Sequence, residues 1–331
     1  MSSSAIKRVT AADVARSLGL SRATVGFVLN DTPGQTIPDA TRQRVFAEAK
    51  RLGYRPHGAA RALASGHSRI ILLVLPDWPL DYSMRAHLDE AALALDRAGY
   101  ALVTMTPHPG GQAQPLWETL RPDVVMGMTP LAPEQVAEIR ASGVEHVIVP
   151  GQSDEPVESA GQLGFADGPK LQVEHLVLRG RTRIAFAGPA DPRLSDLVAD
   201  RRGLAHATAL LYPDVSWLGE RLIDDLSASA AIEEWLSQDV DGIVAYNDDV
   251  AALVVGTALR AGIDVPEALA VVGHDDTPLA RLFVPALSTV RIDTAGLGRY
   301  LAELALSVAT GAPEPSAGPE TAAHLIQRET T

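Results

Sequence analysis

The side chains of greatest chemical interest near the N-terminus are Ser21, Arg22 and Thr24, which surround Ala23. A guanidinium such as that of Arg22 donates paired hydrogen bonds to planar acceptors, among them guanine O6 and N7 and the oxygens of a phosphate. Hydroxyl groups bind phosphate oxygens or base edges, whereas the methyl group of Ala23 offers only an apolar contact. These four residues therefore have the chemistry needed to contact a nucleic acid, provided that one exposed helix presents them.

The spacing of capping and apolar residues predicts the elements that hold this group. Thr10 and Asp13 have the spacing of a capping box, and the helix that follows would end at Gly19. Ser21 is a good N-cap for a second helix. The inward-facing residues of the two helices are expected to be Ala11, Val14, Ala15, Leu18, Val25, Val28 and Leu29. Two helices joined by a short turn are typical of a helix-turn-helix unit.

A third helix would complete this N-terminal unit. It is expected to start at Pro38, placed in the first turn, and to stop at Gly53. Its inward-facing residues would be Val45, Phe46, Ala49 and Leu52. The three helices would then enclose one small core.

The charge of the chain is distributed unevenly. Residues 1–66 contain ten Lys and Arg against four Asp and Glu, although the whole chain has a net charge of −13. Surfaces that bind nucleic acid are basic, because they neutralise phosphates. A basic head on an acidic body suits a DNA-binding unit attached to a sensor, since the body repels phosphate and leaves the head to set the orientation.

Three stretches of the first 66 residues resemble the DNA-binding head of the LacI/GalR repressor family in order and spacing. They are VTAADVARSLGLSRATVGFVLN, TRQRVFAEAKRLGYRP and AARALASG. The resemblance implies a helix-turn-helix head over 1–56, a hinge helix or linker over 57–68, and a recognition helix that starts at Ser21 and enters the major groove. The DNA contacts that it implies are Thr10, Ser21, Arg22, Ala23, Thr24, Phe27, Asn30, Tyr54, Arg61 and Leu63.

Three of these contacts leave alternatives open. Arg22 is expected to read a base, and a phosphate contact without sequence information is the alternative. Gly26 and Phe27 depart from the polar or basic residues usual in the family, and Phe27 would either press on a thymine methyl or a sugar, or pack against the neighbouring loop. Leu63 is implied to wedge a base step in the minor groove. The alternative for 57–68 is a flexible linker, and both hold if the segment folds only on DNA.

The rest of the chain alternates short apolar runs with helical patterns. Runs of continuous rather than alternating apolar residues, spaced by helices, predict parallel sheets covered on both faces. Two such units predict two Rossmann-like lobes, which bind ligands at the carboxyl ends of their strands. The expected strands cover 69–76, 100–105, 123–128, 146–150, 183–188, 241–246 and 268–274.

The resemblance continues through VEHLVLRGRTRIAFAG and the stretch that starts at VDGIVAYNDDVAALVVG. It implies an α/β fold in which the helix-turn-helix head is joined to a two-lobed body like that of periplasmic sugar-binding proteins. The first lobe would be formed by 69–165 and 288–331, including the C-terminal helix and strand, and the second by 166–287. No heptad pattern follows HLIQRETT, which favours a homodimer over a tetramer.

Several residues are expected to bind a small effector. The effector would be a sugar, or alternatively a non-sugar ligand. Asn247, Asp248 and Asp275 match family positions that face the cleft, and helix capping or a hinge hydrogen bond is the alternative for each. Trp78 and Tyr82 would stack on a sugar ring or pack at the rim. The family often has an arginine where Asp200 stands, so either Arg201 replaces it through a local shift or the ligand is unusual. A regulator without an effector is the further alternative.

Composition bounds the remaining functions. The chain has no cysteine, which excludes disulfides and thiolate chemistry, and no His pair with ligand spacing, so no metal or cofactor is expected. Neither a nucleophile elbow nor a Gly-rich phosphate loop is present, which leaves an α/β enzyme with a DNA-binding head only as a remote alternative. The N-terminus lacks a secretory signal, so a cytoplasmic location without membrane contact is expected. The sequence thus predicts a non-enzymatic, effector-modulated repressor that binds a near-palindromic duplex operator.

Overall fold

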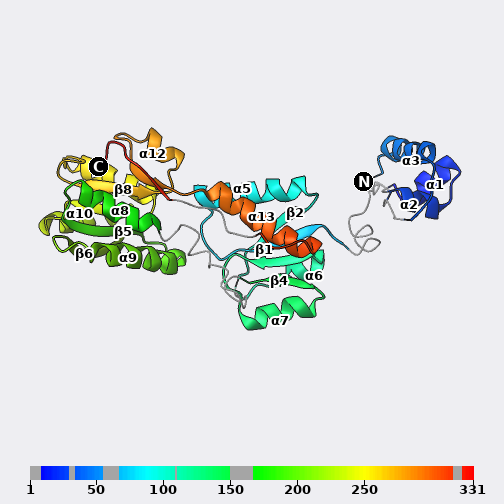
Figure 1. The fold of residues 1–331 in the computed structure, drawn as a ribbon, viewed down its shortest axis with the longest axis horizontal. Helices are drawn as coiled ribbons and strands as arrows, with labels where there is room; N and C mark the ends of the chain where they lie inside the picture. Colours follow the sequence, from blue (N-terminus) through cyan, green and yellow to red (C-terminus); the bar gives the residue numbers. More distant parts are fainter. Residues whose placement is uncertain (1–8, 30–33, 55–66, 109, 150–166, 316–322) are drawn as a thin grey trace, which may run out of the picture.

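The computed structural model describes residues 9–29, 34–54, 67–108, 110–149, 167–315 and 323–331. They form a small helical head and an α/β body with two sheets (Figure 1). No helix among these residues is long and apolar enough to cross a membrane.

The head contains three helices, α1 (Ala11–Leu18), α2 (Arg22–Leu29) and α3 (Asp39–Leu52). The predicted capping box is confirmed, since the Thr10 side chain accepts from the Asp13 N–H and the Asp13 side chain accepts from the Thr10 N–H. The core consists of Val14, Ala15, Val25, Val28, Val45 and Ala49. Glycines in the left-handed conformation end α1 and α3, which explains why the predicted ends at Gly19 and Gly53 are correct.

Two details of α3 differ from the prediction. The helix begins at Asp39, and Pro38 occupies the N-cap position rather than the first turn. Phe46 was expected to face the core, but 51% of its surface is exposed. It follows Val45 directly, and neighbouring positions on a helix point about 100° apart, so the buried stripe through Val45 and Ala49 leaves Phe46 outside.

The first sheet is fully parallel, in the order β2-β1-β3-β4. Alternate residues of β1 supply its two faces: Ile71 and Leu73 join one apolar cluster, and Leu72 and Val74 join the other. Both faces are therefore buried, as the continuous apolar runs predicted. The elements of this lobe are β1 (Ile70–Val74), α5 (Tyr82–Arg97), β2 (Ala101–Met105), α6 (Leu116–Leu120), β3 (Val124–Gly127), α7 (Pro133–Ala141) and β4 (His146–Ile148).

The second sheet has the order β10-β9-β8-β7-β5-β6, in which only β10 is antiparallel to its neighbour. Its strands are β5 (Arg183–Pro189), β6 (Ser216–Ile223), β7 (Gly242–Ala245), β8 (Ala270–His274), β9 (Ser288–Arg291) and β10 (His324–Ile326). The helices of this lobe are α8 (Asp167–Leu178), the 3-10 helix η1 (Pro192–Leu194), α9 (Ser195–Ala209), α10 (Ala228–Ser237), α11 (Asp248–Arg260) and α12 (Pro278–Leu282). The two parallel-sheet lobes agree with the predicted α/β architecture.

The expected assignment of 288–331 to the first lobe requires a correction. Strand β9 pairs with β8 and β10 pairs with β9, so both strands extend the second sheet. The intervening helix α13 (Thr294–Thr310) instead packs along α5 of the first lobe, where Ala302 and Ala305 join the apolar cluster around β1 (Figure 1). A Cβ added at Gly298 of α13 would lie 2.3 Å from the His87 carbonyl oxygen, which shows how closely the two helices approach. The segment after Leu287 therefore crosses between the lobes and returns.

Candidate functional site

The N-terminus of α2 presents the predicted DNA-contacting side chains to solvent. Ser21, Arg22 and Ala23 are exposed, and Arg22 forms no ion pair with another described residue. The Thr24 N–H donates to Ser21 Oγ at 3.0 Å, so Ser21 caps the helix, and the two hydroxyl oxygens lie 2.8 Å apart. The helix thus begins with a free guanidinium beside two ordered hydroxyls, an arrangement suited to a DNA groove.

The structure gives the other predicted DNA contacts different settings. Tyr54 packs against the head core, and Thr10 caps α1 while its hydroxyl donates to Asp13 Oδ2 at 2.7 Å. Phe27 is half-buried but does not join the core cluster of the described head residues, so part of its ring stays available. Asn30, Arg61 and Leu63 lie outside the described residues.

A cavity of about 250 Å³ has walls from both lobes. The first lobe contributes the start of α5, and the second contributes the segments that follow β7 and β8. The second-lobe residues lie at the carboxyl ends of parallel strands, where open α/β sheets bind ligands. The lining residues are Asp81, Tyr82, Ser83, Asn247, Asp248, Asp249, Asp275, Thr277, Pro278 and Leu279.

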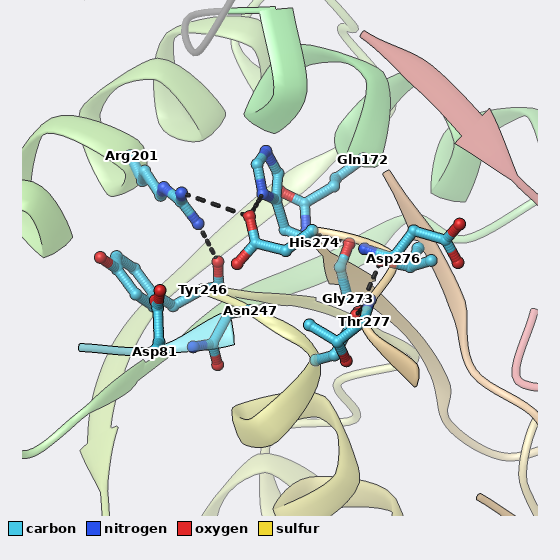
Figure 2. Close-up of polar contacts among 12 residues, drawn as sticks. Asp81, Gln172, Arg201, Tyr246, Asn247, Gly273, His274, Asp276 and Thr277 are labelled. Carbon is cyan, nitrogen blue, oxygen red and sulfur yellow. Dashed lines mark hydrogen bonds and ion pairs between the residues drawn. The ribbon is translucent and has the colours of Figure 1, made fainter. Parts of the chain in front are cut away.

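Arg201, on α9, lies at the centre of a polar cluster beside this cavity. Its Nη1 donates to the Tyr246 carbonyl oxygen, and its Nη2 lies 3.7 Å from Asp275 Oδ1. The guanidinium also lies over the Tyr246 ring, 4.4 Å from the ring centre. Figure 2 shows Arg201 pointing toward Tyr246. Of the two residues between which the sequence left the choice open, Asp200 is exposed on α9 and only Arg201 contacts the site.

Asp275 is held as a carboxylate by its neighbours. Burial alone would raise its pKa, but His274, whose Nδ1 lies 2.6 Å from Asp275 Oδ1, and the charge of Arg201 together lower it. Burial lowers the pKa of His274, which has no exposed surface, and the Arg201 charge lowers it further. A neutral His274 that donates from Nδ1 to an ionised Asp275 agrees with the lowered pKa of each residue. Asp275 therefore presents fixed negative charge to the cavity wall.

Asp248 lines the cavity, but its contacts correspond to the structural alternative, a hydrogen bond between elements, rather than to ligand binding. Its side chain has no exposed surface, and both carboxylate oxygens already accept hydrogen bonds, Oδ2 from the Thr277 N–H at 2.7 Å and Oδ1 from the Thr289 hydroxyl at 2.5 Å. A Cβ at Gly273 would lie only 2.4 Å from Oδ1, so the carboxylate also excludes any side chain there. These contacts tie α11 to the loop after β8 and to β9. We therefore assign Asp248 to holding the cavity wall rather than to binding a ligand.

Asp248→Asn should flatten the pH dependence of stability between pH 5 and 7. Burial raises the pKa of Asp248 from 3.8 to about 7, so the folded protein holds a proton that the unfolded chain has lost in this range. A carboxyl with a raised folded pKa contributes stability at low pH that is lost as the pH rises toward 7. An Asn amide keeps an acceptor for Thr277 and a donor for Thr289 without titrating. Melting temperatures of both proteins across this range test the expectation, which fails if the two profiles stay parallel.

Asn247 combines a capping role with a free polar group. Its Oδ1 accepts from the Val250 N–H at 3.0 Å at the start of α11, whereas no partner is recorded for its amide nitrogen among the described residues. Tyr82, which also lines the cavity, is 54% exposed. Trp78 follows β1 but does not line the cavity. The structure thus brings Tyr82, Asn247 and Asp275 together and leaves Trp78 outside.

Sequence reasoning missed Asp81, Ser83, Asp249 and Thr277. Asp81 caps α5, with Oδ1 accepting from the Met84 N–H at 2.8 Å, and it faces the second lobe across the cavity (Figure 2). Its capping position before a helical run was a readable signal. No signal in the sequence indicated that Asp81 would also lie near residues of the second lobe, because such a contact depends on how the two lobes are placed.

Comparison with known proteins matches both parts of the chain. Residues 10–57 match the model of bacterial regulatory proteins of the lacI family, and residues 173–331 match that of a periplasmic binding protein-like domain. The transcriptional regulator GalS of Salmonella typhimurium is 30% identical over 317 residues, covering 92% of this chain and 91% of its own length. MalR of Streptomyces coelicolor is 29% identical over 325 residues, with the same two coverages. A crystal structure of the lac repressor dimer bound to operator and an anti-inducer superposes with a TM-score of 0.74 at 23% identity, covering 98% of this chain and 99% of that one.

A helix-turn-helix head on a two-lobed, periplasmic-binding-protein-like body defines a class of transcriptional regulators that carry the DNA-binding unit and the sensor in the same polypeptide. Within that class, this chain belongs to the LacI family. The relatives named above are regulators rather than enzymes.

Proposed function

We propose that this protein is a cytoplasmic repressor that binds a near-palindromic operator as a homodimer and responds to a small polar effector in the cavity between its lobes. The observation that carries this proposal is that the cavity walls come from both lobes. A ligand that contacts Asp81 on one side and Asn247 and Asp275 on the other favours one lobe arrangement over another. Such differential affinity is the requirement for allosteric control.

The relatives support the operator and effector parts of the proposal. GalS, MalR and the ribose operon repressor of Bacillus subtilis are regulators by name, and one similar solved structure holds a regulator in complex with cellobiose. In our proposal, effector binding changes lobe closure and shifts the paired hinge segments at 57–68. DNA affinity then falls, because the two heads no longer match both half-sites.

Specific DNA binding can be tested by fluorescence anisotropy at fixed salt. The full chain should bind a duplex from its own promoter at least about a thousandfold more tightly than a random duplex of equal length. Equal affinity for the two duplexes would contradict the proposal. Anisotropy measured with added effector then reports whether the ligand releases DNA.

A further inference from the structure

The walls of the cavity carry more negative than positive charge. The lining residues include three carboxylates besides the buried Asp248, namely Asp81, Asp249 and Asp275, and no Lys, Arg or His among the described residues. The adjacent cation is Arg201, which already faces Asp275 at 3.7 Å and binds the Tyr246 carbonyl. Arg201 therefore pairs with Asp275, and its charge also lowers the pKa of Asp81, whereas neither Asp81 nor Asp249 forms an ion pair in the described chain.

The three carboxylates are close enough to repel one another. Burial raises the pKa of Asp81 and the charges of Asp275 and Asp249 add to this, although the hydrogen bond from the Met84 N–H and the charge of Arg201 act in the opposite direction. Burial and then the charge of Asp275 likewise raise the pKa of Asp249. A positive group placed between these carboxylates would relieve this repulsion.

The geometry favours an organic cation over a metal ion. No group of three or more acidic or histidine side chains in the described chain converges closely enough to hold a metal. The cavity also contains unused hydrogen-bonding groups. The buried hydroxyl of Ser83 has no hydrogen-bond partner among the described residues, and the hydroxyl of Thr277, which is only 9% exposed, has no neighbour for hydrogen bonding there other than the Asp248 carboxyl. Buried polar groups of this kind need a partner, which a hydroxylated ligand supplies.

We propose that the effector is a small hydroxylated amine of the amino-sugar class, whose ammonium group lies between Asp81 and Asp249 while its hydroxyls bond Ser83, Asn247 and Thr277. This inference rests on the proposed function and names the ligand class of the same cavity. The volume of about 250 Å³ is at the small end of ligand pockets and suits a single ring.

Matched pairs of sugars test the charge requirement. Glucosamine and galactosamine would each be compared with the neutral glucose, galactose and N-acetylglucosamine by isothermal titration calorimetry on the full chain at pH 7 and low salt. We expect the better amine to bind about tenfold or more tightly than its neutral counterparts. Asp249→Asn, at an exposed position in the first turn of α11, should reduce this preference to less than about threefold, and Asp81→Asn should act likewise. The control Asp89→Asn, on an exposed part of α5 that does not line the cavity, should leave the preference unchanged.

Two outcomes would overturn the inference: neutral sugars that bind as tightly as the amines, or no binding by either amine. The promoter-DNA measurement separates this failure from failure of the proposed function. If a neutral sugar releases promoter DNA, the proposed function stands and the cationic ligand class is wrong. If the chain does not prefer promoter DNA at all, the proposed function itself is wrong.

Discussion

Arg22→Ala should weaken binding to the promoter duplex by about 1 to 3 kcal/mol, or roughly 5- to 150-fold, and should relax the preference at one base pair of each half-site. Arg22 is the first residue of α2, is exposed, and has no ion pair in the described chain that would hold it away from DNA. Ser21 and Thr24 are already ordered beside it by the cap. Loss of the guanidinium therefore removes a paired contact to a base edge without altering the helix that presents it.

The matched control is Arg16→Ala, which removes an exposed arginine from α1 that is ion-paired with Asp13 at 2.8 Å. We expect it to reduce affinity for promoter and random duplexes to a similar, small extent. Anisotropy titrations with single-base variants of the half-site would locate the base that Arg22 reads. If Arg22→Ala instead weakens promoter and random DNA equally, Arg22 is a phosphate contact, and Phe27 becomes the residue to test for base reading.

The head shows which features a sequence determines locally. Helix ends at Gly19 and Gly53 and the cap at Thr10 were predictable, because each depends on a backbone conformation or a hydrogen bond within a few residues. The exposure of Phe46 was not, because it depends on the rotation of α3 about its axis relative to the other two helices. Apolar character alone does not fix that rotation when adjacent residues are both apolar.

The body shows the same limit at longer range. Seven strands were predictable from continuous apolar runs, whereas Ser216–Ile223 was not, since this edge strand mixes polar and apolar residues and its pairing with β5 is irregular. Asn247 and Asp275 were expected at the cavity from the family resemblance, and their places after parallel strands, whose carboxyl ends meet at one edge, agree with it. The choice between Asp200 and Arg201 was not predictable, because it depends on how α9 is rotated about its axis relative to the cavity.

Gln172→Leu should lower the free energy of unfolding by about 3 kcal/mol and should also weaken ligand binding, although Gln172 does not line the cavity. Gln172 is 1% exposed, and the two hydrogens of its amide nitrogen are shared among the carbonyl oxygens of Ala245 at 2.8 Å, Val272 at 3.1 Å and Gly273 at 2.9 Å. Figure 2 shows it reaching from α8 toward the strand ends. Leucine fills similar space but leaves these carbonyls without their donor.

The loss should reach the ligand because the same strand ends carry the cavity residues. Ala245 is separated from Asn247 by a single residue, and Gly273 is likewise separated from Asp275, so loosened carbonyls shift the groups that line the wall. Urea unfolding measures the stability change, and hydrogen exchange of the β7 and β8 amides shows whether the loosening is local. Gln238→Leu is the control, since the one hydrogen bond of its side-chain amide to a described residue is to Glu234 at 3.3 Å, near the surface. A stability loss as small as that of the control would show that the three carbonyls do not depend on Gln172.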